Sequence, residues 1–328
     1  MDYKPTILSA LETMRLGQLA TKDSAARFKA IAYKKAMDAI RARPGPITSV
    51  DDVKGLDGVG KKVVEKVAEI IATGSLAAAE RVKERTDVGA YELLLGVHGI
   101  GPAKARDLIA SGITSIEGLR AAAAGNPKLL TTAQTLGLKY YESALERIPR
   151  AEMELHEELL LSALAWSLRG TVVGSYRRGA VNSGDIDLVL TWPTTVSAAD
   201  AADGFGELLE TIEISGYMKG ALASGKTKWL GYVALPGKPV RRLDILLTPP
   251  EEHPYAVLYF TGSDKFNIAF RKHAITKGYT LNEHKLTPLR ADVPAAPAMK
   301  AEADIFAFLG LKFIRPQDRV DGGQIVLL

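Results

Sequence analysis

The sequence predicts a multidomain α plus α/β protein, all-α in its first half and mixed α/β in its second. Two observations predict this fold. Apolar residues recur with helical spacing over residues 6–43 and 152–168. From Thr171 onward, short apolar runs of strand length replace that pattern. We therefore expect helical regions first, then a domain with a mixed β-sheet, and then a smaller α/β unit.

The net charge of the chain is concentrated near its amino end. The 328 residues include 42 Lys+Arg and 38 Asp+Glu, a net charge of +4. Residues 1–81 carry 14 of the basic and 10 of the acidic residues, so residues 82–328 are balanced at 28 of each. A basic segment on a balanced body favours an anionic partner, most often nucleic acid, although a solvated basic surface fits the charge equally well.

The composition excludes two classes of protein. The chain has no cysteine, so disulfides and cysteine-ligated zinc are ruled out, as is typical of a reducing compartment. No run approaches the roughly 18 apolar residues that a membrane helix needs. Residues 1–20 contain acidic side chains and lack the apolar core of a secretory leader. We expect a soluble, intracellular protein.

An internal repeat lies in the helical part. The helical pattern of residues 6–43 breaks at Thr21-Lys22-Asp23 and ends at a Pro-Gly-Pro turn. The segment LDGVGKK, which begins at Leu56, is echoed 41 residues later by VHGIGPAK, which begins at Val97. Each copy has the form apolar-x-Gly-apolar-Gly and lies between helical patterns. This is the signature of the helix-hairpin-helix motif.

The repeated turns are typical of binding to the DNA backbone. Their glycines permit a tight turn, and the backbone N–H groups that start the following helix face a phosphate without reading sequence. Carbonyl groups of the same turn can also hold a monovalent cation. One such turn is often a plain helix connection, whereas two turns in register, both followed by lysine, favour DNA binding. The residues concerned are Gly58, Gly60, Lys62, Gly99, Gly101 and Lys104.

The second half is predicted to hold a sheet and then a smaller unit. Apolar runs at residues 171–173, 186–190, 229–235 and 243–247 predict four strands, and a helix is expected over about 201–215. After Pro249-Pro250, the segments 255–260, 266–276 and 304–309 predict the smaller α/β unit.

Three aspartates in two of these strands indicate a reaction centre. Alternate side chains of a strand share a face, so Asp185 and Asp187 point together. Asp244, on a second strand, can supply a third carboxylate. Clustered carboxylates repel one another, and two Mg²⁺ ions about 3.5–4 Å apart would relieve that repulsion and clamp a phosphoryl group. The pattern predicts a metal-dependent nucleotidyltransferase.

The segment before these aspartates supports that interpretation. Gly174 and Ser175 offer N–H and hydroxyl donors, and Arg177 and Arg178 follow closely, as a triphosphate site requires. A lone Asp-x-Asp is common at strand ends, so it carries little weight by itself. The combination with the Gly-Ser, the basic pair and the later Arg-x-Asp is what makes the pattern specific.

With these residues together, the chain resembles the X family of DNA polymerases, the β-like polymerases, over nearly its whole length. The resemblance implies a helical lyase domain at residues 1–81, a DNA-binding fingers region at 82–145, a catalytic nucleotidyltransferase palm at 146–250 and a nucleotide-selecting thumb at 251–328. The motifs that carry it are the two hairpin turns, GSYRRG from Gly174, GDID from Gly184, RRLDI from Arg241 and YFTGSD from Tyr259.

The resemblance implies a role for each of these motifs. Asp185 and Asp187 are expected to bind both metals, and Asp244 the metal that activates the primer 3′-hydroxyl. The residues expected to hold the nucleotide are Arg147, Gly174, Ser175, Arg178, Ser183, Gly184, Tyr259, Phe260, Gly262, Asp264 and Asn267. Further expected DNA contacts are Lys228, Arg242, Arg271 and Glu283, the last of which helps to position the arginine. The alternative role of Arg147 is a charge on the surface. The alternative role of Asp264 and Asn267 is to cap the following helix.

A second activity, 5′-deoxyribose-phosphate lyase, is implied for the amino-terminal domain. Lys66 matches the lysine that forms a Schiff base with an abasic sugar. A lysine amine can act as such a nucleophile when neighbouring cations lower its pKa. Lys62 lies one helical turn away, and Lys29, Tyr33 and Lys54 match residues around the 5′-phosphate. Without the resemblance, Lys62 and Lys66 are an ordinary solvated pair.

The chain departs from the family pattern at five positions. These are Phe28 for a histidine, Leu246 for an arginine beside Asp244, Ile268 for a lysine near the template base, and Ala77 and Ala78 for basic residues behind the lyase pocket. The departures bear on the strength of the lyase and on control of closure. None of them touches the three aspartates.

The predicted function is a template-directed DNA polymerase that fills short gaps in base excision repair. One alternative is template-independent terminal transfer, which the short stretch between palm strands at residues 215–226 and the Tyr259-Phe260 pair disfavour. Another is a non-catalytic DNA-binding protein, which would have no need of the aspartates.

The expected cofactors and partners follow from this function. Two Mg²⁺ ions are expected, with Mn²⁺ as an alternative. Na⁺ or K⁺ is expected at the hairpin carbonyls of Lys54, Leu56, Val59, Leu95, Val97 and Ile100. The partners are gapped or primed DNA and deoxynucleoside triphosphates. The chain is expected to be a monomer, with no membrane partner and no visible motif for a repair ligase or scaffold. The nucleus is favoured as its location over a bacterial cytoplasm or a viral compartment.

Overall fold

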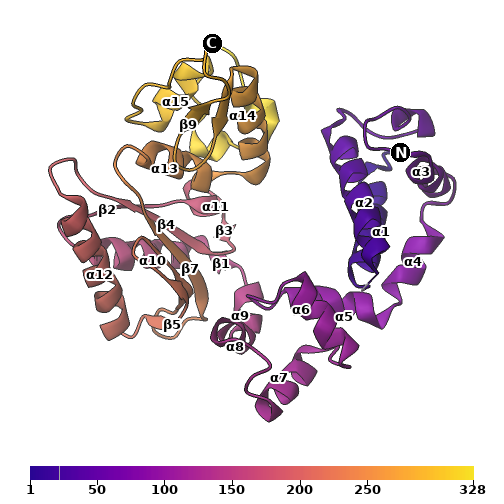
Figure 1. Ribbon diagram of the computed structural model, residues 1–328, viewed down its shortest axis with the longest axis horizontal. Coiled ribbons are helices and arrows are strands. Elements are labelled where there is room, and N and C mark those ends of the chain that lie inside the picture. The colour runs from indigo at the N-terminus through magenta and orange to yellow at the C-terminus, as the bar shows by residue number, and fades with distance from the viewer. Residues whose placement is uncertain (22) are drawn as a thin grey trace. The chain divides into compact units, whose positions relative to one another are not determined.

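The computed structural model describes residues 1–21 and 23–328, which form two compact units, Met1–Lys139 and Tyr140–Leu328 (Figure 1). The predicted break at Thr21-Lys22-Asp23 falls between the first two helices, and Lys22 itself lies outside the described residues. Nowhere in the part of the chain that the structure describes is a helix both long and apolar enough to span a membrane.

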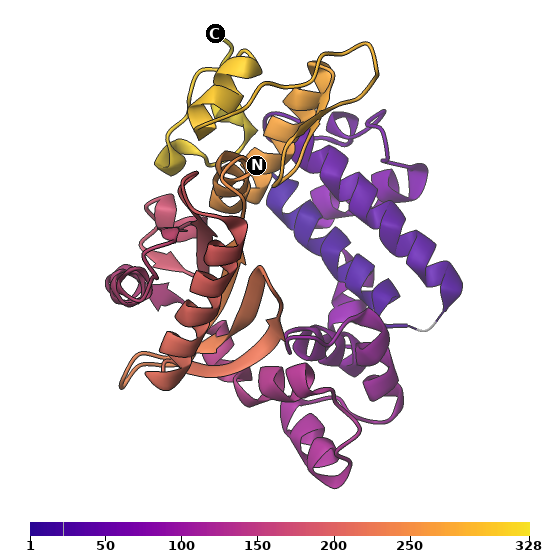
Figure 2. The ribbon, with the colours of Figure 1, turned by 60° about the vertical axis from the view of Figure 1, so that its left-hand side comes forward.

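The first unit is entirely helical. Its helices pack around a core in which Leu11, Ile40, Val67 and Ile70 are completely buried, and α1 and α2 lie side by side in both views (Figures 1 and 2). Its elements are α1 (Lys4–Leu19), α2 (Ser24–Ala42), the 3₁₀ turn η1 (Val50–Asp52), α3 (Lys61–Thr73), α4 (Ala77–Lys83), α5 (Thr86–Leu95), α6 (Pro102–Ala110), α7 (Ile116–Gly125) and α8 (Thr132–Lys139).

The two hairpins differ in the element that precedes each turn. The second turn lies between the α-helices α5 and α6, as expected, but only η1 precedes the first. The carboxylate of Asp52 accepts hydrogen bonds from the N–H groups of Thr48 (2.8 Å) and Ser49 (2.9 Å). These bonds hold the chain in a tight turn, so a helix longer than η1 does not form there.

The second unit is built on a five-stranded mixed sheet. Its strand order is β2-β4-β7-β6-β5, and β4 and β7 form the parallel pair. The elements are α9 (Tyr141–Leu145), β1 (Ile148–Pro149), α10 (Arg150–Ser162), β2 (Arg169–Val172), α11 (Gly174–Arg177), β3 (Asn182–Ser183), β4 (Ile186–Thr191), α12 (Ala198–Ile214), β5 (Met218–Ser224), β6 (Lys228–Val233) and β7 (Arg241–Leu247).

The two faces of this sheet have different neighbours. Leu188 of β4 and Ile245 of β7 point toward one face, where they join Leu160 of α10 and Phe205 of α12 in the main core. Side chains of a strand alternate between faces, so Asp187 and Asp244 lie on the opposite face, which α13 (His253–Thr261) covers in part. Because α10 and α12 pack on the first face of the sheet, the aspartates lie on the face that is less covered.

Two sequence-based expectations for this unit need correction. Most of the stretch 215–226 is not a short loop but the edge strand β5, which pairs with β6 through a bulged register. Its small residues have weak strand propensity, and pairing with β6 overrides that propensity. The helix predicted over 152–168 ends at Ser162, because the chain then turns so that Leu164 and Leu168 pack onto the core.

The smaller α/β unit after the sheet is confirmed. It has its own core, in which Phe266, Phe270 and Phe306 pack ring against ring with centroids 4.7–6.2 Å apart. Its elements are α13 (His253–Thr261), α14 (Asp264–Thr276), β8 (Tyr279–Leu281), β9 (Leu286–Pro288), α15 (Glu302–Phe308) and the 3₁₀ turns η2 (Pro316–Asp318) and η3 (Gly322–Gln324).

Candidate active site

The parallel strands β4 and β7 bring the three aspartates together. Asp187 and Asp244 are register partners, and Asp185 comes one residue before β4. Burial, followed by the nearby charges of Asp185 and Asp244, raises the pKa of Asp187 to about 7. The predicted mutual repulsion of these carboxylates is therefore present in the structure.

Arg242 supplies the countercharge in this arrangement. Its guanidinium contacts Asp185 in a short ion pair and lies 3.6 Å from the Oδ1 of Asp244. Across residues 1–21 and 23–328, no three acidic or imidazole groups converge closely enough to hold a metal ion. The closed carboxylate cage expected from the sequence is thus not formed with Arg242 in this position.

The donor set nevertheless fits a divalent cation. Carboxylate oxygens are the ligands that Mg²⁺ prefers, and a cation beside Asp187 would remove the repulsion that raises its pKa. Lys228 and Phe260 line a small cavity beside Asp187 and Asp244. The Lys228 side chain is exposed at the start of β6.

The Gly-Ser turn lies directly against these carboxylates. Gly174 has a φ of +63°, and a Cβ at this position would lie 2.6 Å from the Oδ2 of Asp187, so only glycine fits. The hydroxyl of Ser175 donates to the Oγ of Ser183 at 3.0 Å. The two serines therefore form one patch of hydroxyl groups beside Asp187.

Two arginines flank this patch. Arg178 donates to the carbonyl of Thr261 at 2.6 Å, and burial lowers its pKa. Arg147 is held by Asn182, whose side-chain oxygen (2.9 Å) and carbonyl (3.0 Å) both accept from its guanidinium. Arg147 is exposed, and a Cβ on Gly184 would lie 2.9 Å from its Nη1.

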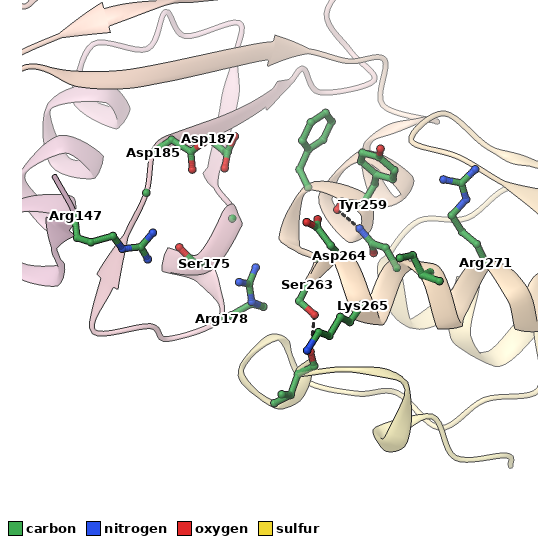
Figure 3. A pocket seen from close by; sticks show the side chains of 17 residues that line it. Arg147, Ser175, Arg178, Asp185, Asp187, Tyr259, Ser263, Asp264, Lys265 and Arg271 are labelled. Atoms are coloured by element: carbon green, nitrogen blue, oxygen red, sulfur yellow. Dashed lines mark hydrogen bonds between the residues drawn. The ribbon is translucent and has the colours of Figure 1, made fainter. Parts of the chain in front are cut away.

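The thumb residues complete a cavity of about 1020 Å³. In Figure 3, Asp185, Asp187, Ser175 and Arg178 of the palm face Ser263, Asp264 and Tyr259 across it. The cavity is lined by Arg147, Gly174, Ser175, Arg178, Gly184, Asp185, Asp187, Tyr259, Phe260, Gly262, Ser263, Asp264, Lys265, Asn267, Ile268, Arg271 and Val320.

The start of α14 decides between the cap and the pocket alternatives for two residues. Ser263, not Asp264 or Asn267, is the N-cap, and its hydroxyl accepts from the N–H of Phe266 at 3.3 Å. Asn267 instead donates to the carbonyl of Tyr259 at 2.7 Å, which ties α14 to the end of α13. Both Asp264 and Asn267 line the cavity.

One expected thumb contact is not formed. Glu283 lies between β8 and β9, where its carboxylate is 4.0 Å from His284. Among the described residues it makes no ion pair with Arg271, which lines the cavity. Sequence reasoning missed Asn182, Lys265, Ser263 and Val320; the clearest available signal was Ser263, a serine directly before a helix, which is typical of an N-cap.

The lyase residues lie on exposed helical surfaces of the first unit. Lys62 and Lys66 are one turn apart on α3, and the ammonium of Lys66 donates to the carbonyl of Lys62 at 3.4 Å. Lys29 is exposed on α2, whereas burial raises the pKa of Tyr33. The carboxylate of Glu69 accepts from the N–H of Ala77 at 2.7 Å, so it caps α4.

The two hairpin turns have the same backbone geometry. Gly58 and Gly99 have φ of +86° and +82°, and a carbonyl two residues earlier in each turn, Leu56 or Val97, accepts an N–H at 3.0 Å. Gly60 and Gly101 are the N-caps of α3 and α6, with open space beside them.

The lysines after the two turns differ in their contacts. The side chain of Lys104 donates to the carbonyl of Leu129 at 2.5 Å, whereas Lys62 and Lys54 are exposed, Lys54 beside Asp51 at 2.8 Å. The backbone carbonyl of Leu95 lies at the end of α5, directly before the second turn. Beside Gly60 and Gly101 the space is open in both copies, but in the second turn the carbonyl of Gly99 accepts from the side chain of Gln134 at 2.8 Å, and the lysine side chain is accessible only in the first.

The positions that depart from the family pattern are mostly exposed. Phe28 is 74% exposed and Ile268 is 58% exposed, so both side chains are accessible to a ligand. Leu246 points to the aspartate face of β7 and packs with Phe260. Ala77 begins α4, and Ala78 packs partly against the core of the first unit.

Four family models match the chain in order. They are a helix-hairpin-helix domain over residues 2–76, the fingers domain of DNA polymerase lambda over 92–144, the DNA polymerase beta palm over 147–250 and the DNA polymerase beta thumb over 256–320. These matches define a chain with polymerase fingers, palm and thumb.

Two curated proteins have similar sequences. DNA polymerase lambda of Rattus norvegicus is 33% identical over 311 residues, which are 89% of this chain and 52% of that protein. DNA polymerase lambda of Arabidopsis thaliana is 31% identical over 338 residues, 97% of this chain and 63% of that protein. The chain thus spans about half to two thirds of the length of these relatives. It belongs to the X family of DNA polymerases.

Proposed function

We propose that this chain is a template-directed DNA polymerase that fills short gaps during base excision repair. The observation that carries the proposal is the cavity in which Asp185 and Asp187 face the start of α14, with Ser175 and Arg178 beside them. Asp244, the register partner of Asp187, lines the small cavity next to it. A carboxylate cluster, a phosphate-binding turn and a base-facing helix in one cavity suit the transfer of a nucleotide to a primer end.

The proposed reaction is in-line attack of the primer 3′-oxygen on the α-phosphorus, with pyrophosphate as the leaving group. Asp244 takes the proton of the 3′-hydroxyl, and Arg242 must first move away from Asp185 and Asp244. Arg147, Ser175, Arg178 and the hydroxyl patch hold the β- and γ-phosphates, so catalysis rests on positioning and charge neutralisation.

Asp185, Asp187 and Asp244 would hold the divalent ions that polymerases of this family use, and we propose two Mg²⁺, with Mn²⁺ as the substitute. When bound, these ions neutralise the charge that develops on the phosphates. At the hairpin turns, the carbonyls of Leu56 and Val97 and their neighbours are proposed to hold Na⁺ or K⁺ against a DNA phosphate.

The thumb is proposed to select the nucleotide. Tyr259, Phe260 and Gly262 form the wall beside the sugar, which favours a deoxynucleotide. Asn267 and Arg271 reach toward the minor groove of the new base pair. The proposed boundaries remain 1–81, 82–145, 146–250 and 251–328 for the lyase, fingers, palm and thumb.

A second activity, the 5′-deoxyribose-phosphate lyase, is proposed for α3. The pair formed by exposed Lys62 and half-buried Lys66 offers an amine nucleophile beside a second cation. Lys29 and Lys54 are proposed to bind the 5′-phosphate. The partners are gapped DNA and deoxynucleoside triphosphates, the acting species is a monomer, and the nucleus is the proposed location.

The proposal is tested on DNA with a one-nucleotide gap, Mg²⁺ and each deoxynucleoside triphosphate in turn. We expect one addition, chosen by the template base, and its loss in Asp187→Asn. Addition that ignores the template base would favour terminal transfer. Tight DNA binding with no addition would favour the non-catalytic alternative.

A further inference from the structure

The last nine residues, 320–328, fold against the thumb beside the nucleotide cavity. Val320 lines the cavity, and η3, which follows it, packs against α14. This segment, which we call the tail, has no part in the function proposed above. Its contacts fall on the helix that carries Asp264, Asn267 and Arg271.

The first contact is at the start of α14. The hydroxyl of Ser263 (Figure 3) donates to the carbonyl of Val320 at 2.6 Å. The same hydroxyl accepts from the N–H of Phe266 at 3.3 Å. The N–H of Ser263 also donates to the carbonyl of Arg319 at 3.4 Å. The N-cap of the helix is thus hydrogen-bonded to the tail immediately before Asp264.

The second contact is in the middle of α14. Gly322 packs so closely on Ala269 that a Cβ at position 322 would lie 2.6 Å from the Cβ of Ala269. Real Cβ atoms do not approach one another this closely, so any side chain at 322 must displace the tail or the helix. Ala269 is two residues from Asn267 and from Arg271 and five residues from Asp264.

The tail is also attached to the body of the thumb. The N–H of Lys312 donates to the carbonyl of Val326 at 2.9 Å, and the N–H of Leu328 donates to the carbonyl of Gly310 at 3.0 Å. Ile325 packs against the thumb core. A segment anchored at both ends in this way can fix the position of the helix between them.

We propose that the tail positions α14 and thereby sets the affinity of the cavity for the incoming nucleotide, with Ser263 and Gly322 as positioning residues. The proposal rests on the function proposed above, because α14 supplies the cavity wall that faces the nucleotide. A displaced helix weakens nucleotide binding while the aspartates, on separate strands, keep their places. The expected signature is a higher KM with little change in kcat.

The first test is Gly322→Ala in the full chain, assayed on one-nucleotide-gapped DNA. We expect the KM for the correct deoxynucleotide to rise about fivefold, the loss of roughly one hydrogen bond's worth of positioning, with kcat nearly unchanged. The double variant Gly322→Ala/Ala269→Gly removes the colliding methyl group and is expected to restore the KM. Ala269→Gly alone and Val326→Ala, whose side chain is 48% exposed, are the controls.

A second pair of variants tests the hydrogen bond at the cap. Ser263→Ala removes the donor to Val320 and is expected to raise the KM by a similar factor, whereas Ser263→Thr keeps a hydroxyl and restores part of the affinity. Thermal melting of each variant separates a local shift from a general loss of folding, because Phe266 and the thumb core remain intact.

The outcomes separate this inference from the proposed function. If the unmodified chain adds no templated nucleotide, the proposed function fails. If it does so and Gly322→Ala keeps the original KM, or loses kcat alone, the tail does not position α14. A raised KM that Ala269→Gly does not restore would equally overturn the contact as its cause.

Discussion

The palm and the amino-terminal helices hold their charged groups in opposite ways. In the palm, Arg241 is 4% exposed and donates to the carboxylate of Glu152 at 2.6 Å, itself 6% exposed. On α2 the ion pair Arg41–Asp38 (3.2 Å) is half exposed, and on α3 Lys62 is exposed and Lys66 half-buried. The Arg241–Glu152 pair is therefore fixed by the fold, whereas the side chains of Arg41, Asp38 and Lys62 are accessible to a ligand.

This difference explains why the two regions give sequence signals of unequal strength. A carboxylate on the open face of a buried strand has few structural reasons to be there, so Asp187 indicates chemistry once the Gly-Ser turn and Asp244 accompany it in the sequence. A lysine pair on an exposed helix is ordinary, and Lys66 acquires meaning only from the family pattern. The predictions below probe each side of the contrast, beginning with the largest effect.

The largest effect is expected in the palm cavity. Asp187→Ala removes a carboxylate from the reaction centre and is expected to lower the rate of nucleotide addition roughly 10³-fold or more. Asp203→Asn, an exposed acidic residue of α12, is the matched control. Single-turnover addition to gapped DNA measures both. Comparable rates for the two variants would remove Asp187 from the chemistry.

The next effect concerns stability. Arg241→Met leaves Glu152 buried without its cation, which is expected to cost about 3–5 kcal/mol of unfolding free energy. Arg41→Met breaks a half-exposed pair and is expected to cost less than about 1 kcal/mol. Urea unfolding followed by circular dichroism gives both values. Equal losses would mean that the buried pair is no more fixed than the exposed one.

A pH effect follows from the same buried network. His156 is fully buried with its Nδ1 2.7 Å from the hydroxyl of Tyr217, and burial lowers its pKa from 6.5 to about 4. The unfolded chain therefore takes up this proton first, and the contribution of His156 to the unfolding free energy should fall by about 2 kcal/mol between pH 7.5 and pH 5. This stability is fully present above pH 6.5.

The double variant His156→Leu/Tyr217→Phe keeps the site apolar and is expected to flatten that slope. Urea unfolding at half-unit pH steps measures it. Glu152, whose pKa is lowered, stays ionised above pH 5. Asp187, whose pKa of about 7 lies in this range, titrates in both proteins, so the difference between their slopes isolates the histidine. An unchanged slope in the double variant would assign the pH dependence to another group.

The smallest effect is expected on α3. Lys66→Ala should reduce borohydride trapping of a 5′-deoxyribose-phosphate end by about tenfold, because Lys62, one turn away, still offers an amine. Lys61→Ala, on the same helix, is the control. Trapping that is equal in the two variants would exclude Lys66 as the Schiff-base residue.

Much of the fold could be predicted from the sequence because its signals are local. The strand of Asp187, the glycine turns at Gly58 and Gly99 and the helical pairs follow from periodicity and from backbone conformations that glycine alone adopts. The edge strand β5 could not be predicted, since its small residues take strand form only through pairing with β6. The first hairpin lost its leading helix to a carboxylate that bonds its own backbone.

The residues of the candidate site could be predicted from the sequence, but the contacts between their side chains could not. The sequence placed Asp185, Asp187 and Asp244 together, yet gave no sign that Arg242 lies between two of them, because a bridging cation depends on side-chain direction across strands. The hydrogen bonds between Asn182 and Arg147 and between the tail and Ser263 likewise join segments that are distant in the sequence. Such contacts have no periodicity to detect.

The parallel register of β4 and β7 restricts how this chain can change over evolutionary time. Moving β7 by a single position would turn Asp244 under α12 and bring Leu243 or Ile245 out to the phosphates. An insertion or deletion in this strand is therefore tolerable only if it involves two residues, and it then moves Asp244 about two residues along the strand. Lengthening is confined to the connections, such as the segment before Arg241, where the chain can grow without altering which side any carboxylate faces.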